Sequence, residues 1–315
     1  MSNYQLIQGD CSELLQQLPD NSIDLLITSP PYYNARDYVH YQSYDEYLHK
    51  MRSVFTITFD KLKNYHMCVI NVGDVIGLAG KSKSTSKKFS ISANFTIFMQ
   101  EIGFRYIDDI IWDKGEVQSK RNFVGKNYPY QKYPINAYEH ILVFQKIDNT
   151  APRPKCPICN QSQSRVNGIN NGIITYECAN PDCIKSKTGR GKRYSEFQNM
   201  KNNYQIDENK ISLDIIEKWR RDIVEISPVK KINLNGENIL GHTAPFPLEI
   251  PLWAISYYSG INDTVLDCFM GSGTTGVACM KLNRNFIGME LQEEYLKVST
   301  KRIEEINAKV GAEHE

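Results

Sequence analysis

The sequence alternates apolar segments of strand length with amphipathic segments of helix length, in two separate blocks, and this alternation limits the possible folds. Such alternation is typical of a largely parallel sheet that helices cover on both faces. The predicted strands are Tyr4–Gln8, Ile23–Ile27, Met67–Val72, Tyr106–Trp112, Glu139–Gln145, Asp263–Asp267 and Asn285–Glu290. The predicted helices are Cys11–Leu18, Tyr44–Leu62, Phe89–Ile102, Ile250–Ser259, Thr274–Leu282 and Glu293–Ala308. The pattern therefore predicts an α/β fold.

Between the two blocks lies a region that is rich in Asn, Gln, Lys and Cys and poor in apolar periodicity. We expect three parts: a first α/β half at 1–150, an inserted module at 151–234, and a second α/β half at 235–315. A chain of 315 residues with 41% hydrophobic residues can bury one substantial core and carry such a module.

Charge and segment composition narrow the class of protein. No apolar run is long enough to span a bilayer, and the first residues lack the layout of a secretory signal, so we expect a cytoplasmic protein without a membrane partner. The net charge is only +1, yet positive charge gathers in two runs, Lys81–Lys88 and Ile184–Tyr194. Either run could be a solvated loop or could meet a nucleic acid, depending on what lies beside it.

A glycine loop, Asp267–Thr274, connects an apolar strand to a helix. Glycines at such a turn let the backbone approach a ligand at the carboxyl end of a parallel strand. Glu290 ends the next predicted strand, where a carboxylate can accept hydrogen bonds from ribose hydroxyls. These features predict an adenosine-type cofactor, and they fit a nicotinamide dinucleotide as well as S-adenosylmethionine.

The tetrapeptide Ser29–Pro30–Pro31–Tyr32 follows another buried strand. Two successive prolines remove two backbone donors, so carbonyl oxygens face out beside the Ser29 hydroxyl. These oxygens can accept both hydrogens of an NH2 group, and the Tyr32 ring can stack on a planar substrate. Taken alone, the motif could also be a loop stiffened by its prolines.

Four of the eight cysteines form two close pairs in the central region: Cys156 with Cys159, and Cys178 with Cys183. In a reducing cytoplasm such pairs are more often metal ligands than disulfides. Four thiolates suit tetrahedral zinc, which would fold a module too polar to hold itself together. The alternatives are free thiols or an incomplete zinc knuckle. Of the other four, we expect Cys11, Cys68 and Cys279 to be buried, whereas Cys268 borders the glycine loop.

Together, the tetrapeptide and the loop closely resemble the amino-methylating DNA methyltransferases, a family with a (D/N/S)PP(Y/F) tetrapeptide and an FxGxG loop. The tetrapeptide precedes the loop here, with the irregular region between them. This order is similar to that of the β subgroup, in which a target-recognition region separates a catalytic half from a cofactor-binding half. The resemblance implies a class I, Rossmann-like, circularly permuted methyltransferase fold with a zinc-ribbon-like insert.

The resemblance also implies roles for individual residues. It gives catalysis to Ser29, Pro30, Pro31 and Tyr32. It gives cofactor binding to Asp10, His242, Thr243, Phe246, Asp267, Phe269, Gly271, Gly273, Thr274 and Glu290. A substitution such as Gly273→Asp is expected to fill the space of the cofactor and leave the fold intact. Cys268 departs from the family, which often has proline at this position.

The implied reaction is methyl transfer from S-adenosylmethionine to N4 of a flipped-out cytosine in double-stranded DNA, within a restriction-modification system. Serine at the first tetrapeptide position resembles cytosine-N4 enzymes, whereas aspartate is usual in adenine-N6 enzymes. Adenine-N6 methylation, methylation of RNA or protein, and a non-catalytic zinc-ribbon DNA-binding protein are the alternatives. The system implies a cognate restriction endonuclease as partner, and a monomer or a homodimer is expected.

Overall fold

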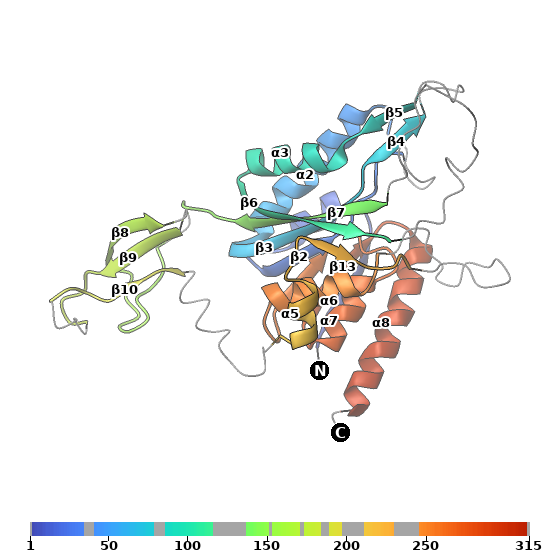
Figure 1. Cartoon of the computed structure of the whole chain (residues 1–315). Helices are drawn as coiled ribbons and strands as arrows, with labels where there is room; N and C mark the ends of the chain where they lie inside the picture. The colour runs from blue at the N-terminus through green and yellow to red at the C-terminus, as the bar shows by residue number, and fades with distance from the viewer. Residues whose placement is uncertain are drawn as a thin grey trace.

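The chain folds around an eight-stranded sheet whose strands come from both ends of the sequence (Figure 1). The computed structural model describes residues 2–34, 41–78, 86–115, 137–150, 153–170, 173–183, 189–196, 211–229 and 246–313. The strand order is β1-β13-β12-β2-β3-β7-β6-β11. The strands are β1 (Tyr4–Gln8), β2 (Ile23–Thr28), β3 (Leu62–Val72), β6 (Phe104–Asp113), β7 (Tyr138–Lys146), β11 (Ile223–Glu225), β12 (Thr264–Asp267) and β13 (Asn285–Glu290).

The sheet is largely parallel, as predicted. The run from β1 to β3 is parallel throughout, β7 is antiparallel to both of its neighbours, and β11 is parallel to β6. Every residue of β2 is buried, because strands in the middle of a two-sided parallel sheet contact helices on both faces. The predicted α/β fold is confirmed.

Two hydrophobic cores fill the space between the sheet and its helices. One face carries α1 (Cys11–Leu14), a 3-10 turn (Leu15–Gln17), α2 (Tyr44–Lys61) and α3 (Ile91–Ile102). The other carries α5 (Leu213–Lys218), α6 (Glu249–Tyr258), α7 (Thr274–Lys281) and α8 (Glu293–Glu313). None of the helices in the described part of the chain is both long and apolar enough to cross a bilayer.

Local signals explain where α2 begins. Ser43 caps the helix by accepting a hydrogen bond from the Glu46 backbone N–H, at 3.0 Å. The Glu46 carboxylate in turn accepts from the Gln42 N–H at 2.7 Å, which nearly completes a capping box. The helix then buries Tyr47 and Phe55 against the sheet. Polar residues before an apolar period therefore specify this boundary.

Two predicted helices differ from the structure at their ends. The segment predicted as one helix at Cys11–Leu18 is a single α-turn followed by the 3-10 turn. The helix predicted from Phe89 begins at Ile91, because Phe89 ends strand β5 (Ser86–Phe89), which pairs with β4 (Val75–Leu78). The spacing of apolar side chains alone did not distinguish a 3-10 turn from helix in the first case, or a strand end from helix in the second.

The central region forms a separate small sheet beside the main body (Figure 1). Its strands are β8 (Ser164–Asn170), β9 (Ile173–Cys178) and β10 (Arg193–Tyr194), with β9 in the middle. The end of the range predicted for the insert belongs to the main body, because β11 pairs with β6. The Trp219 ring next to β11 stacks on Trp253 of α6, with centroids 4.4 Å apart. Strand β11 is only three residues long, so the apolar pattern of the sequence did not show that the chain had returned to the main sheet before residue 234.

Candidate functional site

The tetrapeptide and the glycine loop lie at the same edge of the sheet. They follow β2 and β12, which are neighbouring parallel strands paired at Leu25 with Val265 and at Leu26 with Leu266. Carboxyl ends of adjacent parallel strands meet at one edge, where ligands of open α/β sheets bind. The structure thus joins two motifs that are more than 230 residues apart in the sequence.

A buried carboxylate connects the two motifs directly. Asp267 is fully buried and accepts three hydrogen bonds: from the Thr28 hydroxyl at 2.7 Å, the Thr275 hydroxyl at 2.6 Å and the Phe269 N–H at 3.1 Å. Burial raises the pKa of Asp267 to about 6, although these donors favour its charged form. Its carboxylate, predicted to bind cofactor, is directed at protein donors and shapes the loop.

The second predicted acid, Glu290, is hydrogen-bonded to the glycine loop. Gly271 has a φ of 53°, and its N–H donates to one Glu290 oxygen at 2.8 Å. The Gln292 N–H donates to the other oxygen, also at 2.8 Å. Burial raises the pKa of Glu290. Glu290 therefore lies at the end of β13 beside the loop, where the sequence places an acceptor for an adenosine ribose.

The expectation that a side chain at position 273 would leave the fold intact is wrong. Gly273 has a φ of 77°, and a Cβ built there would lie 2.8 Å from the Ser299 Cβ and 3.2 Å from the Ile303 Cδ1, both on α8. A larger residue would therefore push against α8 and disturb the packing of α7. This glycine permits close approach between helices, so Gly273→Asp cannot test cofactor binding alone.

Asp10, another residue predicted to bind cofactor, lies at the end of β1, the strand next to β13. Asp10 follows β1, caps α1 through Ser12 and pairs with Lys50 at 2.9 Å. Partial burial opposes ionisation of Asp10, but hydrogen bonds from Ser12 and Lys50 lower its pKa below the ordinary value. The Gly9 N–H donates to the Glu290 carbonyl at 3.0 Å, which brings the ends of β1 and β13 together.

Five more residues were predicted from the sequence to bind cofactor: Phe246, Phe269, Thr274, His242 and Thr243. Phe246 and Thr274 are buried, and Phe269 packs against the core beside α1–α3. His242 and Thr243 lie outside the described residues.

The side chains of the tetrapeptide have partners that the sequence did not indicate. The Tyr32 hydroxyl donates to the Glu139 carboxylate at 2.8 Å and lies 3.4 Å from the Asn71 Oδ1. The Ser29 hydroxyl lies 3.5 Å from the same Asn71 oxygen. Asn71 and Glu139 belong to the predicted strands β3 and β7. The apolar pattern that predicts these strands does not indicate that their polar residues contact the tetrapeptide.

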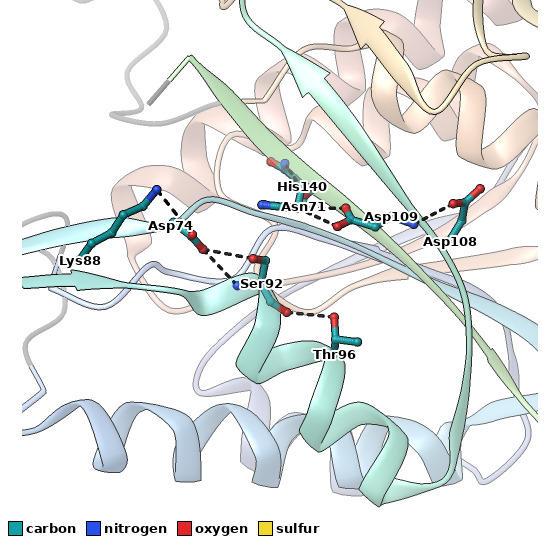
Figure 2. Close-up of polar contacts among 8 residues, drawn as sticks. All are labelled: Asn71, Asp74, Lys88, Ser92, Thr96, Asp108, Asp109 and His140. Atoms are coloured by element: carbon teal, nitrogen blue, oxygen red, sulfur yellow. Dashed lines mark hydrogen bonds and ion pairs between the residues drawn. The ribbon is translucent and has the colours of Figure 1, made fainter. Parts of the chain in front are cut away.

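Asn71 is held by the next strand. Its side-chain amide donates to the His140 carbonyl at 3.2 Å, and the His140 ring contacts the Asp109 carboxylate at 2.9 Å (Figure 2). The polar residues next to the tetrapeptide therefore form one connected set across β3, β7 and β6.

The four paired cysteines come together in the small sheet. The Sγ atoms of Cys156 and Cys183 are 3.8 Å apart, those of Cys159 and Cys178 are 3.7 Å apart, and all four lie within 4.8 Å of one another. Disulfide sulfurs would be about 2.05 Å apart, whereas sulfurs about 2.3 Å from one tetrahedral zinc ion would be about 3.8 Å apart. The arrangement therefore fits a four-thiolate metal site.

The thiols of the four-cysteine group differ in pKa, and the other four cysteines lie elsewhere in the protein. A backbone hydrogen bond from Gln161 lowers the pKa of Cys159 to about 6, whereas burial raises the pKa of Cys178 and raises that of Cys183 to about 12. The other four cysteines are buried in the two cores: Cys11, Cys68, Cys268 and Cys279.

Residues 23–301 match the model of a DNA methylase family whose members modify N6 or N4 amino groups. The chain is similar to the Type II beta methyltransferase M.BslI of Bacillus sp. (strain NEB-606), with 34% identity over 95% of this chain. It spans only 27% of that relative's length. It is 27% identical to the Type II methyltransferase M.BglI of Bacillus subtilis, covering 94% of this chain and 84% of the relative.

Solved structures share the fold. A DNA modification methylase from Thermus thermophilus, in complex with S-adenosyl-L-methionine, superposes with a TM-score of 0.63 at 21% identity, covering 97% of this chain and 96% of the other. The cytosine-N4-specific PvuII DNA methyltransferase superposes with a TM-score of 0.59 at 21% identity, covering 98% and 93%.

The Asp267 contacts predict a loss of stability on substitution. Asp267→Ala leaves three buried donors without an acceptor, so the free energy of unfolding should fall by roughly 2–4 kcal/mol. Asp267→Asn keeps an acceptor oxygen and a similar shape, and should lose less. Chemical denaturation of the three proteins measures the difference.

The raised pKa of Asp267 gives this carboxyl group a pH signature. Because its pKa is about 6 in the folded state and 3.8 is the ordinary value, the folded protein holds the proton more tightly. The contribution of this group to stability is therefore complete below about pH 4 and is lost as pH rises through about 6. Asp267→Asn has no carboxyl group at this position, so its free energy of unfolding should lack this pH-dependent contribution. Equal slopes of unfolding free energy against pH for the wild type and Asp267→Asn would contradict the assignment.

Proposed function

This chain belongs to the N6/N4 DNA methylase family, and from that membership we propose that it transfers a methyl group from S-adenosylmethionine to N4 of cytosine in DNA. The observation that carries the proposal is the contact between Thr28 and Asp267, which places the tetrapeptide beside the glycine loop. The tetrapeptide suits an amino group and the glycine loop suits an adenosine cofactor. Methyl transfer requires the two groups to be held side by side, at the same edge of the sheet.

The tetrapeptide supplies acceptors for the amino group. If the Ser29 hydroxyl and the Pro30 carbonyl accept its two hydrogens, the nitrogen lone pair can be directed at the methyl group that bound S-adenosylmethionine supplies. The amino nitrogen would gain the methyl group as the sulfonium sulfur–methyl bond breaks, and its extra proton would pass to solvent. Positioning and electrostatics are sufficient for this step, without a covalent enzyme intermediate.

The cofactor would lie against residues from three adjacent strand ends. Glu290 offers carboxylate oxygens for ribose hydroxyls, and Asp10 offers a second acid at the end of β1. Phe269 supplies apolar surface within the loop itself, and Phe246 is buried in the core beside α5–α8. Gly271 has a φ of 53°, a left-handed conformation that glycine adopts without strain and that forms the turn of the loop.

We assign the target base from the serine at position 29. The PvuII enzyme with the shared fold is named as cytosine-N4-specific, which supports this choice. A base inside a duplex cannot reach the site, so it must be extruded, at a cost of a few kcal/mol, and stacked on Tyr32. Adenine N6 is the other outcome of the test below.

The small sheet offers a surface for the DNA backbone. Arg165 of β8 and Arg193 of β10 lie directly opposite Glu177 of β9, in one row across three strands. Glu177 contacts Arg165 at 2.7 Å and Arg193 at 3.8 Å. The Glu177 side chain is 6% exposed, whereas the arginines are 71% and 53% exposed, so both keep donors for phosphates.

Other proposed partners follow from the relatives. Both relatives described above are named as Type II methyltransferases, so we place this chain in a restriction-modification system with a cognate endonuclease. In the basic run Ile184–Tyr194, Arg190 and Lys192 are exposed just before Arg193, while residues 184–188 lie outside the described residues. Of the run Lys81–Lys88, residues 81–85 also lie outside them.

The four thiols predict about one zinc ion per chain, which would hold the small sheet together. The double change Cys156→Ser and Cys159→Ser should release the metal and weaken DNA binding more than cofactor binding. Elemental analysis of purified protein measures the zinc, with Cys11→Ser in the main body as the control. Metal-free protein with full DNA affinity would rule out the zinc site.

The tetrapeptide predicts the product and the effect of two substitutions. Ser29→Ala removes one acceptor from a buried amino group, so methylation should slow by about one to two orders of magnitude. Tyr32→Ala should slow it further by removing the stacking surface. Cofactor affinity, measured by calorimetry, should stay unchanged in both variants. Mass spectrometry of nucleosides should find N4-methylcytosine, and N6-methyladenine would refute the assignment of the base.

The arginine row predicts the salt dependence of DNA binding. Arg165→Ala and Arg193→Ala should each weaken binding to any duplex and reduce the slope of log affinity against log salt by about 1. Arg52→Ala is a matched control, because Arg52 pairs with Glu101 on the surface of the main body at 2.6 Å. Slopes equal to that of the control would remove the small sheet from the DNA interface.

A further inference from the structure

We propose that Glu139 and Lys114 are positioning residues for methyl transfer, which fix the plane of the Tyr32 ring on which the extruded base stacks. The inference deepens the proposed function and rests on it. It concerns two residues that neither sequence motif includes, on strand β7 and directly after strand β6.

The Tyr32 side chain is fixed at its hydroxyl and at its ring edge. The hydroxyl donates to the Glu139 Oε2 at 2.8 Å. Burial, and then the nearby Glu139 charge, raise the pKa of Tyr32 well above 10, so the hydroxyl stays a donor. A Cβ built on Gly73 would lie 3.1 Å from the Tyr32 Cε2 and 3.0 Å from the Glu139 Cγ. Glycine at position 73 thus leaves just enough room for both side chains.

Both oxygens of Glu139 have a partner. One accepts from Tyr32, and the other pairs with the Lys114 ammonium at 2.5 Å. The Glu139 and Lys114 side chains are 15% and 19% exposed. Charges this sheltered are costly unless they are paired, so each holds the other in place. With its oxygens engaged in this way, Glu139 acts on the reaction through Tyr32.

Lys114 rests on a rigid support. Its ammonium lies 5.1 Å from the centroid of the Trp112 ring, within the range of a cation–π contact. The Trp112 indole N–H donates to the buried Ile226 carbonyl at 2.7 Å. Ile226 directly follows β11, the strand by which the chain returns from the small sheet. The support of Tyr32 therefore extends to the return segment.

Without Glu139, the Tyr32 hydroxyl still has the Asn71 Oδ1 as an acceptor, but at a long 3.4 Å. The ring would then sample more orientations. Small errors in the placement of a reacting group can cost large factors in rate, so a looser stacking surface should lower turnover. Turnover should fall more than cofactor affinity, because Glu139 contacts the base-stacking residue.

A double-mutant cycle tests the inference. Tyr32→Phe keeps the ring and removes only the hydroxyl, and we expect it to lower kcat about tenfold, the effect of one lost hydrogen bond. Glu139→Ala should lower kcat by a similar factor. If Glu139 acts through the Tyr32 hydroxyl, the double variant should lose no more than either single variant. Glu139→Gln keeps an acceptor oxygen and should retain more turnover than Glu139→Ala.

Two controls separate this inference from folding and from the proposed function. Cofactor affinity should stay near wild type in all cycle variants, and Tyr32→Phe should also keep its melting temperature. Glu139→Ala leaves the Lys114 charge unpaired and should melt at a lower temperature, so kcat is compared at a temperature at which every variant is folded. Arg52→Ala with Glu101→Ala removes an ion pair whose side chains are 47% and 51% exposed, and should leave kcat unchanged. Wild-type protein that methylates no DNA base would refute the proposed function. Active wild-type protein in which the two losses multiply to about a hundredfold would overturn only the role of Glu139.

Discussion

The three hydrogen bonds to the Asp267 carboxylate determine how the rest of the site is arranged. Their donors come from the end of β2, from the glycine loop and from the first turn of α7. A fully buried carboxylate is tolerated only when its oxygens are satisfied, so these three elements cannot shift independently. Ser29 follows Thr28 directly, and its distance to the loop is therefore set by Asp267. Glu290 makes an equivalent contact with Gly271 from the other side.

The small sheet depends on interactions other than those that hold the main sheet. Its buried hydrophobic cluster consists of three thiols of the cysteine group and two tyrosine rings, which is a very small core. A domain of this size usually needs a metal or a disulfide. Asn64 of β3 contacts the chain on both sides of the small sheet. Its side chain accepts a hydrogen bond from the Asp148 N–H, before the small sheet, at 2.8 Å. It also donates to the Glu196 carboxylate, after β10, at 3.3 Å. That residue links the orientation of the small sheet to the main sheet.

Periodicity was sufficient to predict the parallel sheet, because buried strands and amphipathic helices leave distinct patterns along the chain. The convergence of the cysteines could also be foreseen from their spacing. The pairing of Lys114 with Glu139, which accepts from Tyr32, could not, since Glu139 and Lys114 become neighbours only when β6 and β7 pair. For the same reason the sequence suggested that Gly273 faces a ligand, whereas its neighbours on α8 come from a segment 26 residues later. Side-chain contacts across strands depend on register, which one sequence does not show.

The separation between Thr28 and Asp267 also has a consequence in time. Strand β2 lies between β3 and β12, and β12 is 239 residues further along the chain. At the pace of synthesis, about 5–20 residues per second, β2 waits about 10–50 s for this neighbour. During that interval one edge of β2 is unpaired. Because β2 is apolar and an unpaired edge can bond to a strand of another chain, nascent chains can associate at this edge. The same delay means that the tetrapeptide cannot meet the glycine loop until the chain has been synthesised beyond Asp267.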